Sequence, residues 1–276
     1  MNFVKNLKPI TICDIGASPI NKTEFIEDLF NNSNSQIIGF EPNVEEFKKL
    51  KETSRKKYYN IAIGDGNKHN LNICYAPGMT SFLEPNLNYL KLFHGFEKWS
   101  KIIRKEKIST KKLDDLDEKI DFLKIDVQGY ESEIIKFGKE KIKNSLVVQI
   151  ETSPTPLYIN EKSFSYVSNK LEELGFSLHM FERINSKTFK PMILNNDKYS
   201  GLFHLFQLDC VYIKNFNEID KLNIEDLKKL ILILYWSFNS YDLVDLLVRK
   251  LDNLTNEKFI VQYREIMKKK KFIKKY

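Results

Sequence analysis

Ile10-Thr-Ile-Cys-Asp-Ile-Gly-Ala-Ser18, close to the start of the chain, joins a run of apolar and β-branched residues to a glycine. Such a run is typical of a buried strand, and glycine allows the backbone that follows to approach a ligand closely. Apolar residues at helical spacing come next, between Phe25 and Phe30. The segment therefore predicts a strand–turn–helix unit whose turn faces a binding site.

The same rhythm continues along the chain. Further strands are expected at residues 36–40, 58–63, 71–75, 120–126 and 146–150, and helices at 44–51, 131–138 and 164–174. Residues 89–103 indicate an irregular helix, and residues 178–181 and 208–214 an antiparallel edge pair. Alternation of strands with helices favours an α/β fold, here a Rossmann-like, doubly wound, mostly parallel seven-stranded sheet.

The chain changes character near residue 216, after which only helical spacing is found. Three apolar patterns predict helices between Leu227 and Phe238, Leu243 and Val248, and Phe259 and Met267. We therefore expect a sheet domain over residues 1–215. A C-terminal helical appendage with a basic tail is expected over residues 216–276.

Composition excludes several classes of protein. The 276 residues carry a net charge of +7, but six lysines lie between Lys268 and Lys275, so the rest carries about +1. This argues against a nucleic-acid-binding surface. Three distant cysteines support neither a zinc site nor a disulfide framework. Without an apolar leader or a run of about 20 apolar residues, the expected location is the cytoplasm.

Three expected strands end in residues suited to a nucleoside ligand. Gly16 follows Asp14, Glu41 follows the second strand, and Gly64-Asp65 follows the third. A carboxylate such as Glu41 can accept hydrogen bonds from both ribose hydroxyls, and Asp65 can accept one from an adenine amino group. Because only one glycine of a G-x-G-x-x-G loop is present, a pyrophosphate is disfavoured. An adenosyl ligand without phosphate points to S-adenosyl-L-methionine.

Several motifs resemble those of the FkbM-type S-adenosylmethionine-dependent methyltransferases. They are Cys13-Asp-Ile-Gly-Ala-Ser-Pro19, Gly39-Phe-Glu-Pro-Asn43, Ala62-Ile-Gly-Asp-Gly66, Gly78-Met-Thr-Ser-Phe-Leu-Glu-Pro85, Lys112-Leu-Asp-Asp-Leu116, Asp121-Phe-Leu-Lys-Ile-Asp-Val-Gln-Gly-Tyr-Glu131, Gln149-Ile-Glu151 and Leu208-Asp-Cys-Val-Tyr-Ile-Lys214. The resemblance covers nearly the whole chain. It departs at Ser18-Pro19-Ile20, where a general methyltransferase signature has further glycines.

The resemblance implies methyl transfer from S-adenosyl-L-methionine, in this reading to a hydroxyl of a sugar, a polysaccharide precursor or a secondary metabolite. The expected cofactor-binding residues are Asp14, Gly16, Ala17, Ser18, Glu41, Pro42, Ala62, Gly64, Asp65, Asp126 and Gln128. The expected catalytic residues are Asp126 and Glu151, which end adjacent strands, and His204 beside the edge strand. A hydroxyl acceptor needs a base within hydrogen-bond reach. We expect no metal ion.

Two other functions remain open from the sequence. The chain can be a catalytically silent, cofactor-binding partner of a glycosyltransferase, or a nucleotide-binding oxidoreductase, which the missing glycines disfavour. The expected partner is a small-molecule or glycan hydroxyl acceptor, without nucleic acid or a transmembrane segment. The appendage is a candidate for association with a glycosyltransferase or a membrane surface.

Overall fold

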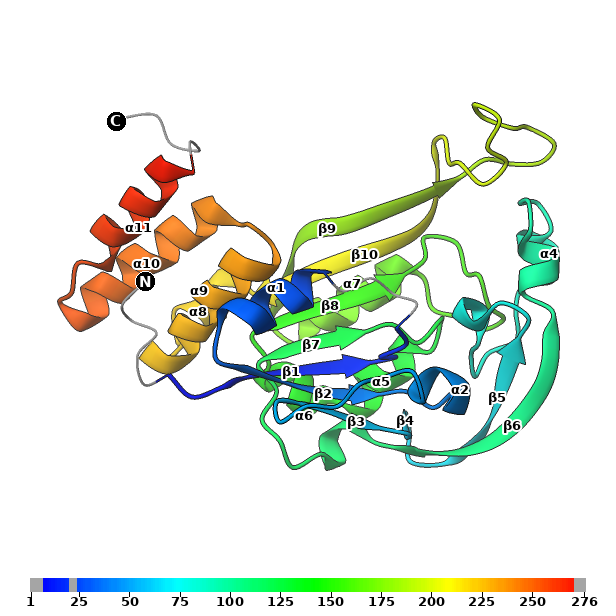
Figure 1. Ribbon diagram of the computed structural model, residues 1–276, viewed down its shortest axis with the longest axis horizontal. Coiled ribbons are helices and arrows are strands. Elements are labelled where there is room, and N and C mark those ends of the chain that lie inside the picture. The colour runs from blue at the N-terminus through cyan, green and yellow to red at the C-terminus, as the bar shows by residue number, and fades with distance from the viewer. Residues whose placement is uncertain (1–6, 20–23, 271–276) are drawn as a thin grey trace.

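The computed structural model describes residues 7–19 and 24–270. Its centre is a seven-stranded sheet in the order β3-β2-β1-β7-β8-β10-β9 (Figure 1). The strands are β1 (Ile10–Ile15), β2 (Ser35–Phe40), β3 (Lys56–Tyr59), β7 (Phe122–Ile125), β8 (Val147–Thr152), β9 (Phe176–Lys187) and β10 (His204–Lys214). Only β10 runs antiparallel to its neighbours. The expected α/β class with a large, mostly parallel sheet is confirmed.

The order of the strands fixes where a ligand can bind. From β1 the chain adds β2 and β3 on one side, then returns to pair β7 with the other edge of β1 and continues outward through β8. The direction of winding therefore reverses between β1 and β7. In open α/β sheets the crevice at the carboxyl ends of the strands beside such a reversal is the usual binding site.

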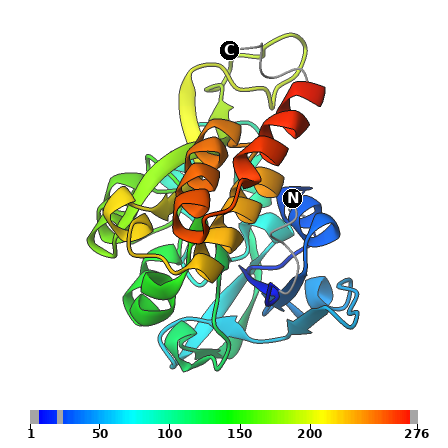
Figure 2. The ribbon, with the colours of Figure 1, turned by 90° about the vertical axis from the view of Figure 1, so that its left-hand side faces the viewer.

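Helices cover both faces of the sheet, as Figure 2 shows from the side. One face carries α1 (Glu24–Asn32) and α9 (Ile224–Ser237), with α10 (Tyr241–Thr255) and α11 (Phe259–Lys269) beyond them. The other carries α5 (Glu131–Phe137), α6 (Lys139–Asn144) and α7 (Phe164–Glu173). Three short helical segments, α2 (Val44–Phe47), α8 (Phe216–Ile219) and η3 (Leu113–Asp115), complete the set around the sheet. Each face buries its own apolar core.

A small second sheet departs from the sequence prediction. The single strand expected at 58–63 is divided between β3 and β4 (Ala62–Ile63), and β4 belongs to a three-stranded sheet with β5 (Lys68–Cys74) and β6 (Ile102–Lys111). The helix expected at 89–103 was wrong over most of its length. Gly95, at φ 85°, separates α3 (Leu87–Leu90) from α4 (Phe96–Trp99). The chain then extends into β6, which pairs with β5.

The edge pair expected at 178–181 and 208–214 is confirmed as antiparallel, but it is much longer than predicted. β9 has 12 residues and β10 has 11, and together they form a hairpin that projects beyond the sheet (Figure 1). Polar residues such as Asn185 and Ser186 in β9 weaken its apolar pattern. Pairing with β10 holds these residues in a strand that the apolar pattern alone did not predict.

The C-terminal helices share a core with the sheet. Apolar residues of α9, such as Leu230, are buried with Phe25 of α1 and Phe122 of β7. The division of the chain after residue 215 stays a prediction. Of the basic tail, residues 271–276 lie outside the described part of the chain. No helix within residues 7–19 and 24–270 is long and apolar enough to cross a membrane.

A buried ion pair fastens α9 to the amino ends of β1 and β7. Lys229 is 5% exposed and donates to Asp121 Oδ2 over 2.8 Å and to the Pro9 carbonyl over 3.0 Å. Asp121 Oδ2 also accepts from the Thr11 backbone N–H over 2.9 Å. One oxygen atom thus connects two strands and a helix that are far apart in the sequence.

Replacing Lys229 by methionine is expected to destabilise the fold by about 3–5 kcal/mol, because it leaves the Asp121 carboxylate buried without its close, buried charge partner. Lys119→Met provides the control, since Lys119 contacts the same carboxylate and Asp226 but is 53% exposed. That control should change stability by about 0–1 kcal/mol. Urea denaturation measures both. Equal losses of stability in the two variants would contradict the stabilising role given to the buried Lys229–Asp121 pair.

Candidate active site

A pocket opens at the carboxyl ends of β1, β2 and β7, where the direction of winding reverses. About 690 Å³ lies between its lining residues, a figure that includes space open to solvent. Its lining residues are Ile15, Gly16, Ser18, Phe40, Glu41, Pro42, Asn43, Glu46, Ala62, Ile63, Leu71, Pro77, Gly78, Thr80, Ser81, Phe82, Asp126, Val127 and Gln128. Seven of the residues expected to bind the cofactor are among them.

The turn after β1 depends on Gly16. Its φ is +80°, and a Cβ atom there would lie 1.8 Å from the backbone oxygen of Asp126. Gly16 N donates to the Phe40 carbonyl over 2.9 Å, while Asp126 N donates to the Ile15 carbonyl over 2.9 Å. The absence of a side chain therefore allows the ends of three strands to meet at the pocket.

Behind this turn, Lys124 lies between two acids. Its Nζ is 2.9 Å from Asp14 Oδ1 and 3.8 Å from Asp126 Oδ2. Burial alone would lower the pKa of Lys124, but the Asp14 and Asp126 carboxylates outweigh it and hold the pKa above its ordinary value. Asp14 is paired with this lysine and does not line the pocket, and Ala17 does not line it either.

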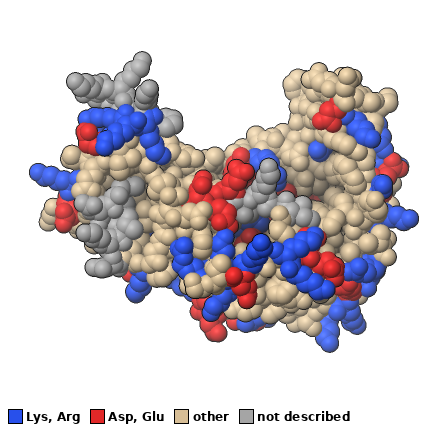
Figure 3. All heavy atoms as spheres, viewed as in Figure 1, with Lys and Arg blue, Asp and Glu red and all other residues tan. Residues whose placement is uncertain are grey.

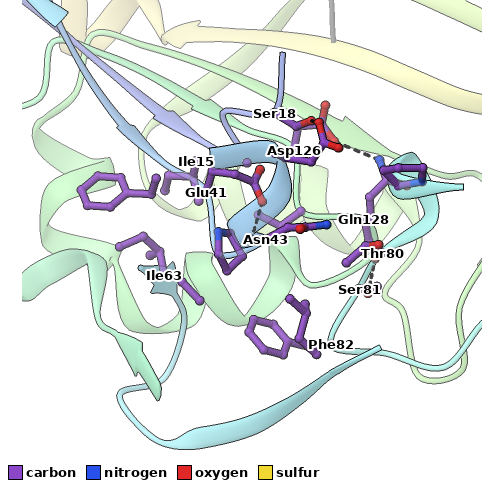
Figure 4. Close-up of a pocket in the computed structure, with 18 of the residues that line it drawn as sticks. Ile15, Ser18, Glu41, Asn43, Ile63, Thr80, Ser81, Phe82, Asp126 and Gln128 are labelled. Carbon is purple, nitrogen blue, oxygen red and sulfur yellow. Dashed lines mark hydrogen bonds between the residues drawn. The ribbon is translucent and has the colours of Figure 1, made fainter. Parts of the chain in front are cut away.

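Glu41 lies at the end of β2 and is 6% exposed. Its Oε1 accepts from Asn43 N over 2.7 Å, which fixes the carboxylate at the pocket wall (Figure 4). Burial raises the pKa of Glu41 to about 7, with the Asn43 hydrogen bond opposing the shift. The carboxylate can thus change charge near neutral pH.

The apolar part of the pocket comes from side chains that the sequence did not mark as site residues. Ile63 and Leu71 belong to the small sheet, and Phe82 lies between its strands β5 and β6. Figure 4 shows Ile63 and Phe82 on one side of the pocket and Asp126 and Gln128 on another, with Glu41 between. Such a division into apolar and polar regions suits a ligand with a planar ring at one end and charges at the other.

Gly64 and Asp65, expected to meet adenine, are placed differently. Neither lines the pocket. The Asp65 carboxylate accepts from Asn67 N over 2.9 Å and lies 2.8 Å from His69 Nε2. Burial would raise the pKa of Asp65, but the hydrogen bonds from Asn67 and His69 hold it below its ordinary value. The carboxylate is engaged in its own turn, and the adenine contact stays a prediction.

Gln128 bridges two carboxylates at the end of the pocket. Its Nε2 donates to Asp126 Oδ1 over 3.0 Å and to Glu151 Oε2 over 2.6 Å. Tyr158 OH donates to Gln128 Oε1 over 2.9 Å, which sets the orientation of the amide. The Gln128 backbone has φ 56°, and its carbonyl accepts from Ser81 Oγ over 2.6 Å. The amide is therefore fixed on both sides, and it keeps the two like charges together.

Glu151 lines a small cavity beside the pocket, too narrow to hold a water molecule, and Gln128 lines both. The pKa of Glu151 is raised well above its ordinary value. Burial is the largest cause, and the negative charges of Asp126 and Asp209 raise it further. Arg183 NH2, 3.8 Å from Glu151 Oε1, opposes this shift. A carboxylate with a raised pKa is a stronger base near neutral pH than a solvated one.

His204, the third expected catalytic residue, is the first residue of β10 and lies next to the loop that joins β9 to β10. Its Nε2 is 2.6 Å from Tyr89 OH, and its ring packs against Phe93 and Phe189. It lines neither the pocket nor the cavity at Glu151. Its role as a base stays a prediction.

No three histidine, cysteine, aspartate or glutamate side chains come together as a metal site in residues 7–19 and 24–270.

The sequence matches the methyltransferase FkbM domain over residues 14–178, a range that includes Gly16, Glu41, Asp126, Gln128 and Glu151. The chain belongs to the FkbM methyltransferase family. S-adenosylmethionine, predicted from the sequence, is the cofactor of this family.

Among solved structures, a LepI variant in complex with SAH and a substrate analogue is similar to the chain at a TM-score of 0.34 and 8% identity. The LepI complex with SAM is similar at a TM-score of 0.32 and 8% identity. Each match covers 77% of this chain and 44% of LepI, so the chain spans less than half of that protein. No curated protein sequence matches the chain significantly.

Gly16→Ala is expected to destabilise the protein by at least about 1–3 kcal/mol, because alanine is strained at this positive φ and its Cβ meets backbone atoms. Gly78→Ala is the matched control. Gly78 lines the same pocket, but a Cβ there has nothing within 4 Å, so stability should change by less than about 1 kcal/mol. Thermal unfolding measures the stability of both variants. Comparable losses of stability in the two would show that the close approach at Gly16 is not required.

Proposed function

We propose that the protein is an S-adenosylmethionine-dependent O-methyltransferase with a Rossmann-like fold of the class I methyltransferase type. Its acceptor in this proposal is a hydroxyl group of a sugar, a polysaccharide precursor or a secondary metabolite. The proposal combines the family with the charges of the pocket and the base beside it.

The charge of the pocket lining carries the proposal. Glu41, Glu46 and Asp126 line the pocket, whereas none of its described lining residues is lysine, arginine or histidine. Such a lining repels phosphates and attracts a ligand with positive charge. S-adenosylmethionine carries a sulfonium and an ammonium group and no phosphate. The same lining disfavours the oxidoreductase alternative, because a dinucleotide brings a pyrophosphate.

Each part of the pocket suits one part of this cofactor. Glu41 can accept hydrogen bonds from the ribose hydroxyls, and the apolar side chains of Ile63 and Phe82 can enclose the adenine ring. Asp126 lies where a carboxylate can bind the ammonium group. Gly16 brings the ends of β1 and β7 together at the wall of the pocket.

S-adenosylmethionine supplies a methyl group on a positively charged sulfur, ready for in-line displacement. The protein has to align the acceptor hydroxyl, for which proximity and orientation can contribute roughly 7–11 kcal/mol. Glu151 is the best placed residue to accept the hydroxyl proton, because its pKa is raised and Gln128 holds its Oε2. Gln128 acts as a positioning residue, fixed in turn by Tyr158.

A catalytically silent partner of a glycosyltransferase remains the second candidate, because it would need the same cofactor pocket. The buried, hydrogen-bonded Glu151 favours the enzyme, since cofactor binding alone does not require a base in the adjoining cavity. Release of S-adenosylhomocysteine in the presence of sugar-nucleotide, glycan and metabolite fractions separates the two. A protein that binds S-adenosylmethionine but releases no product with any fraction would favour the silent partner.

Glu41→Ala is expected to weaken S-adenosylmethionine binding by about 10- to 200-fold, roughly 1.4–3 kcal/mol, through loss of charge-assisted hydrogen bonds to the ribose. The pKa of Glu41 near 7 adds a sharper test. The ionised carboxylate is the better acceptor, so wild-type affinity should fall as the pH drops below about 7, and this component should vanish in Glu41→Gln. Calorimetry from pH 6 to pH 8 measures it. Parallel pH profiles of wild type and Glu41→Gln would place the ribose elsewhere.

Glu151→Gln is expected to reduce methyl transfer by about 10²–10⁴-fold while leaving cofactor affinity within a few fold, because it removes the base. Since the pKa of Glu151 is raised, wild-type activity should rise with pH well above the ordinary glutamate range near 4.3. Glu133→Gln is the control, because Glu133 is an acid on α5 that accepts a hydrogen bond from Lys136 over 3.5 Å. Wild-type turnover in Glu151→Gln would remove Glu151 from the mechanism.

A further inference from the structure

The loop that joins β9 to β10, residues 188–203, is unusually rich in exposed apolar side chains. We call it the hairpin tip. Of 22 exposed large hydrophobic residues in the described chain, six lie within these 16 residues. They are Phe189, Met192, Ile193, Tyr199, Leu202 and Phe203. Phe203 is 86% exposed, more than any other large hydrophobic residue described. A concentration of this kind marks an interaction surface.

The tip is held in place on one side and open on the other. The ring of Phe189 stacks on Phe93 at a centroid distance of 5.0 Å, and that of Tyr199 lies 4.9 Å from Trp99. Lys190 Nζ pairs with Glu97 at 2.5 Å. These contacts brace the tip against the α3–α4 segment, residues 87–101. The exposed side chains are therefore presented by an ordered support.

Figure 1 shows the hairpin reaching beyond the sheet, with the tip at its far end. In the space-filling view of the same face, the lobe at the upper right is largely uncharged, with few charged side chains on it (Figure 3). The tip thus projects from the molecule as an apolar surface and lies away from the helices α10 and α11.

The charges around this apolar surface are mainly positive. Residues 87–101 and 188–203 together contain five lysines, against Glu97 and Asp197, which leaves a net charge of +3. Exposed apolar and aromatic side chains flanked by lysines suit a bilayer with anionic headgroups, where the apolar groups enter the interface and the lysines stay at the phosphates.

We propose that the hairpin tip binds the surface of an anionic lipid bilayer. A second copy of the chain fits the same surface less well, because a two-fold interface would bring the lysines of the two tips together. The lipid surface instead offers opposite charge to the lysines and an apolar layer to Phe203 and Met192. This inference does not depend on the proposed methyl transfer.

The test uses the full chain and vesicles of two compositions, pure phosphatidylcholine and an equimolar mixture of phosphatidylcholine and phosphatidylglycerol. We expect sedimentation with the mixed vesicles and much weaker sedimentation with the neutral ones. The double variant Met192→Ser/Phe203→Ser should lose binding by more than about tenfold, because both side chains lose their transfer into the interface. Full binding by this variant would overturn the proposal.

Leu254→Ser/Val261→Ser is the matched control, because these residues of α10 and α11 are 51% and 56% exposed. Thermal unfolding shows whether each variant is folded. The C-terminal lysines also attract anionic vesicles, so Lys268→Glu/Lys269→Glu is compared. Retained binding in Leu254→Ser/Val261→Ser and in Lys268→Glu/Lys269→Glu supports the hairpin tip as the binding surface. If reversing the tail charges abolishes binding while the tip variant keeps it, the tail is the binding surface and the proposal is wrong.

Two further measurements identify what the tip contacts. The chain has two tryptophans, so Trp236→Phe leaves only Trp99, which contacts the tip through Tyr199. Brominated lipids should quench the fluorescence of Trp99 in the Trp236→Phe variant. In the Trp99→Phe variant they should leave the fluorescence of Trp236 unchanged. Ultracentrifugation without lipid tests the other occupant. A wild-type dimer that becomes a monomer in Met192→Ser/Phe203→Ser would assign the surface to a second copy and overturn the proposal.

Discussion

The contact between Gly16 and the backbone of Asp126 is the constraint on which the rest of the site depends. Because Gly16 has no side chain, the ends of β1 and β7 meet, and the same turn donates from its backbone to the end of β2. Three strand ends are then fixed relative to one another. The residues that follow them, Glu41 on one side and Asp126 on the other, face a common space.

The carboxylates of Asp14, Asp126 and Glu151 lie close together, so their mutual repulsion has to be offset by neighbouring groups. Lys124 offsets it from within the sheet, because this lysine is 3% exposed and its ammonium group lies near both Asp14 and Asp126. Gln128 offsets it from the loop, since one amide donates to two carboxylates. The loop keeps its shape because Glu131 accepts from the backbone of Val127 and Gly129. The result is a ligand pocket that favours positive charge and a neighbouring carboxyl with a raised pKa.

Much of this arrangement could be predicted from the sequence. The glycine turn after β1 and the acids at or near the carboxyl ends of β2, β7 and β8 were found because each follows a short apolar run. Lys124 lies inside an apolar strand, where a lysine signals a buried partner. The partner lies 110 residues away, and that distance hides it. The apolar wall at Ile63 and Phe82 was missed as well. Ile63 lies in the small sheet and Phe82 between its strands β5 and β6, and β6 was not predicted from the sequence.

The sequence by itself determined the alternation of strands and helices in the large sheet, the family and the residue types at the strand ends, because these depend on local periodicity and on motifs of a few residues. Only the tertiary structure decided which of those residues share a space. It paired Asp14 with Lys124, engaged Asp65 in its own turn and placed His204 at the hairpin instead of the pocket lining. Hydrogen bonds and ion pairs between distant segments form only after the chain has folded, and residue spacing does not encode their partners.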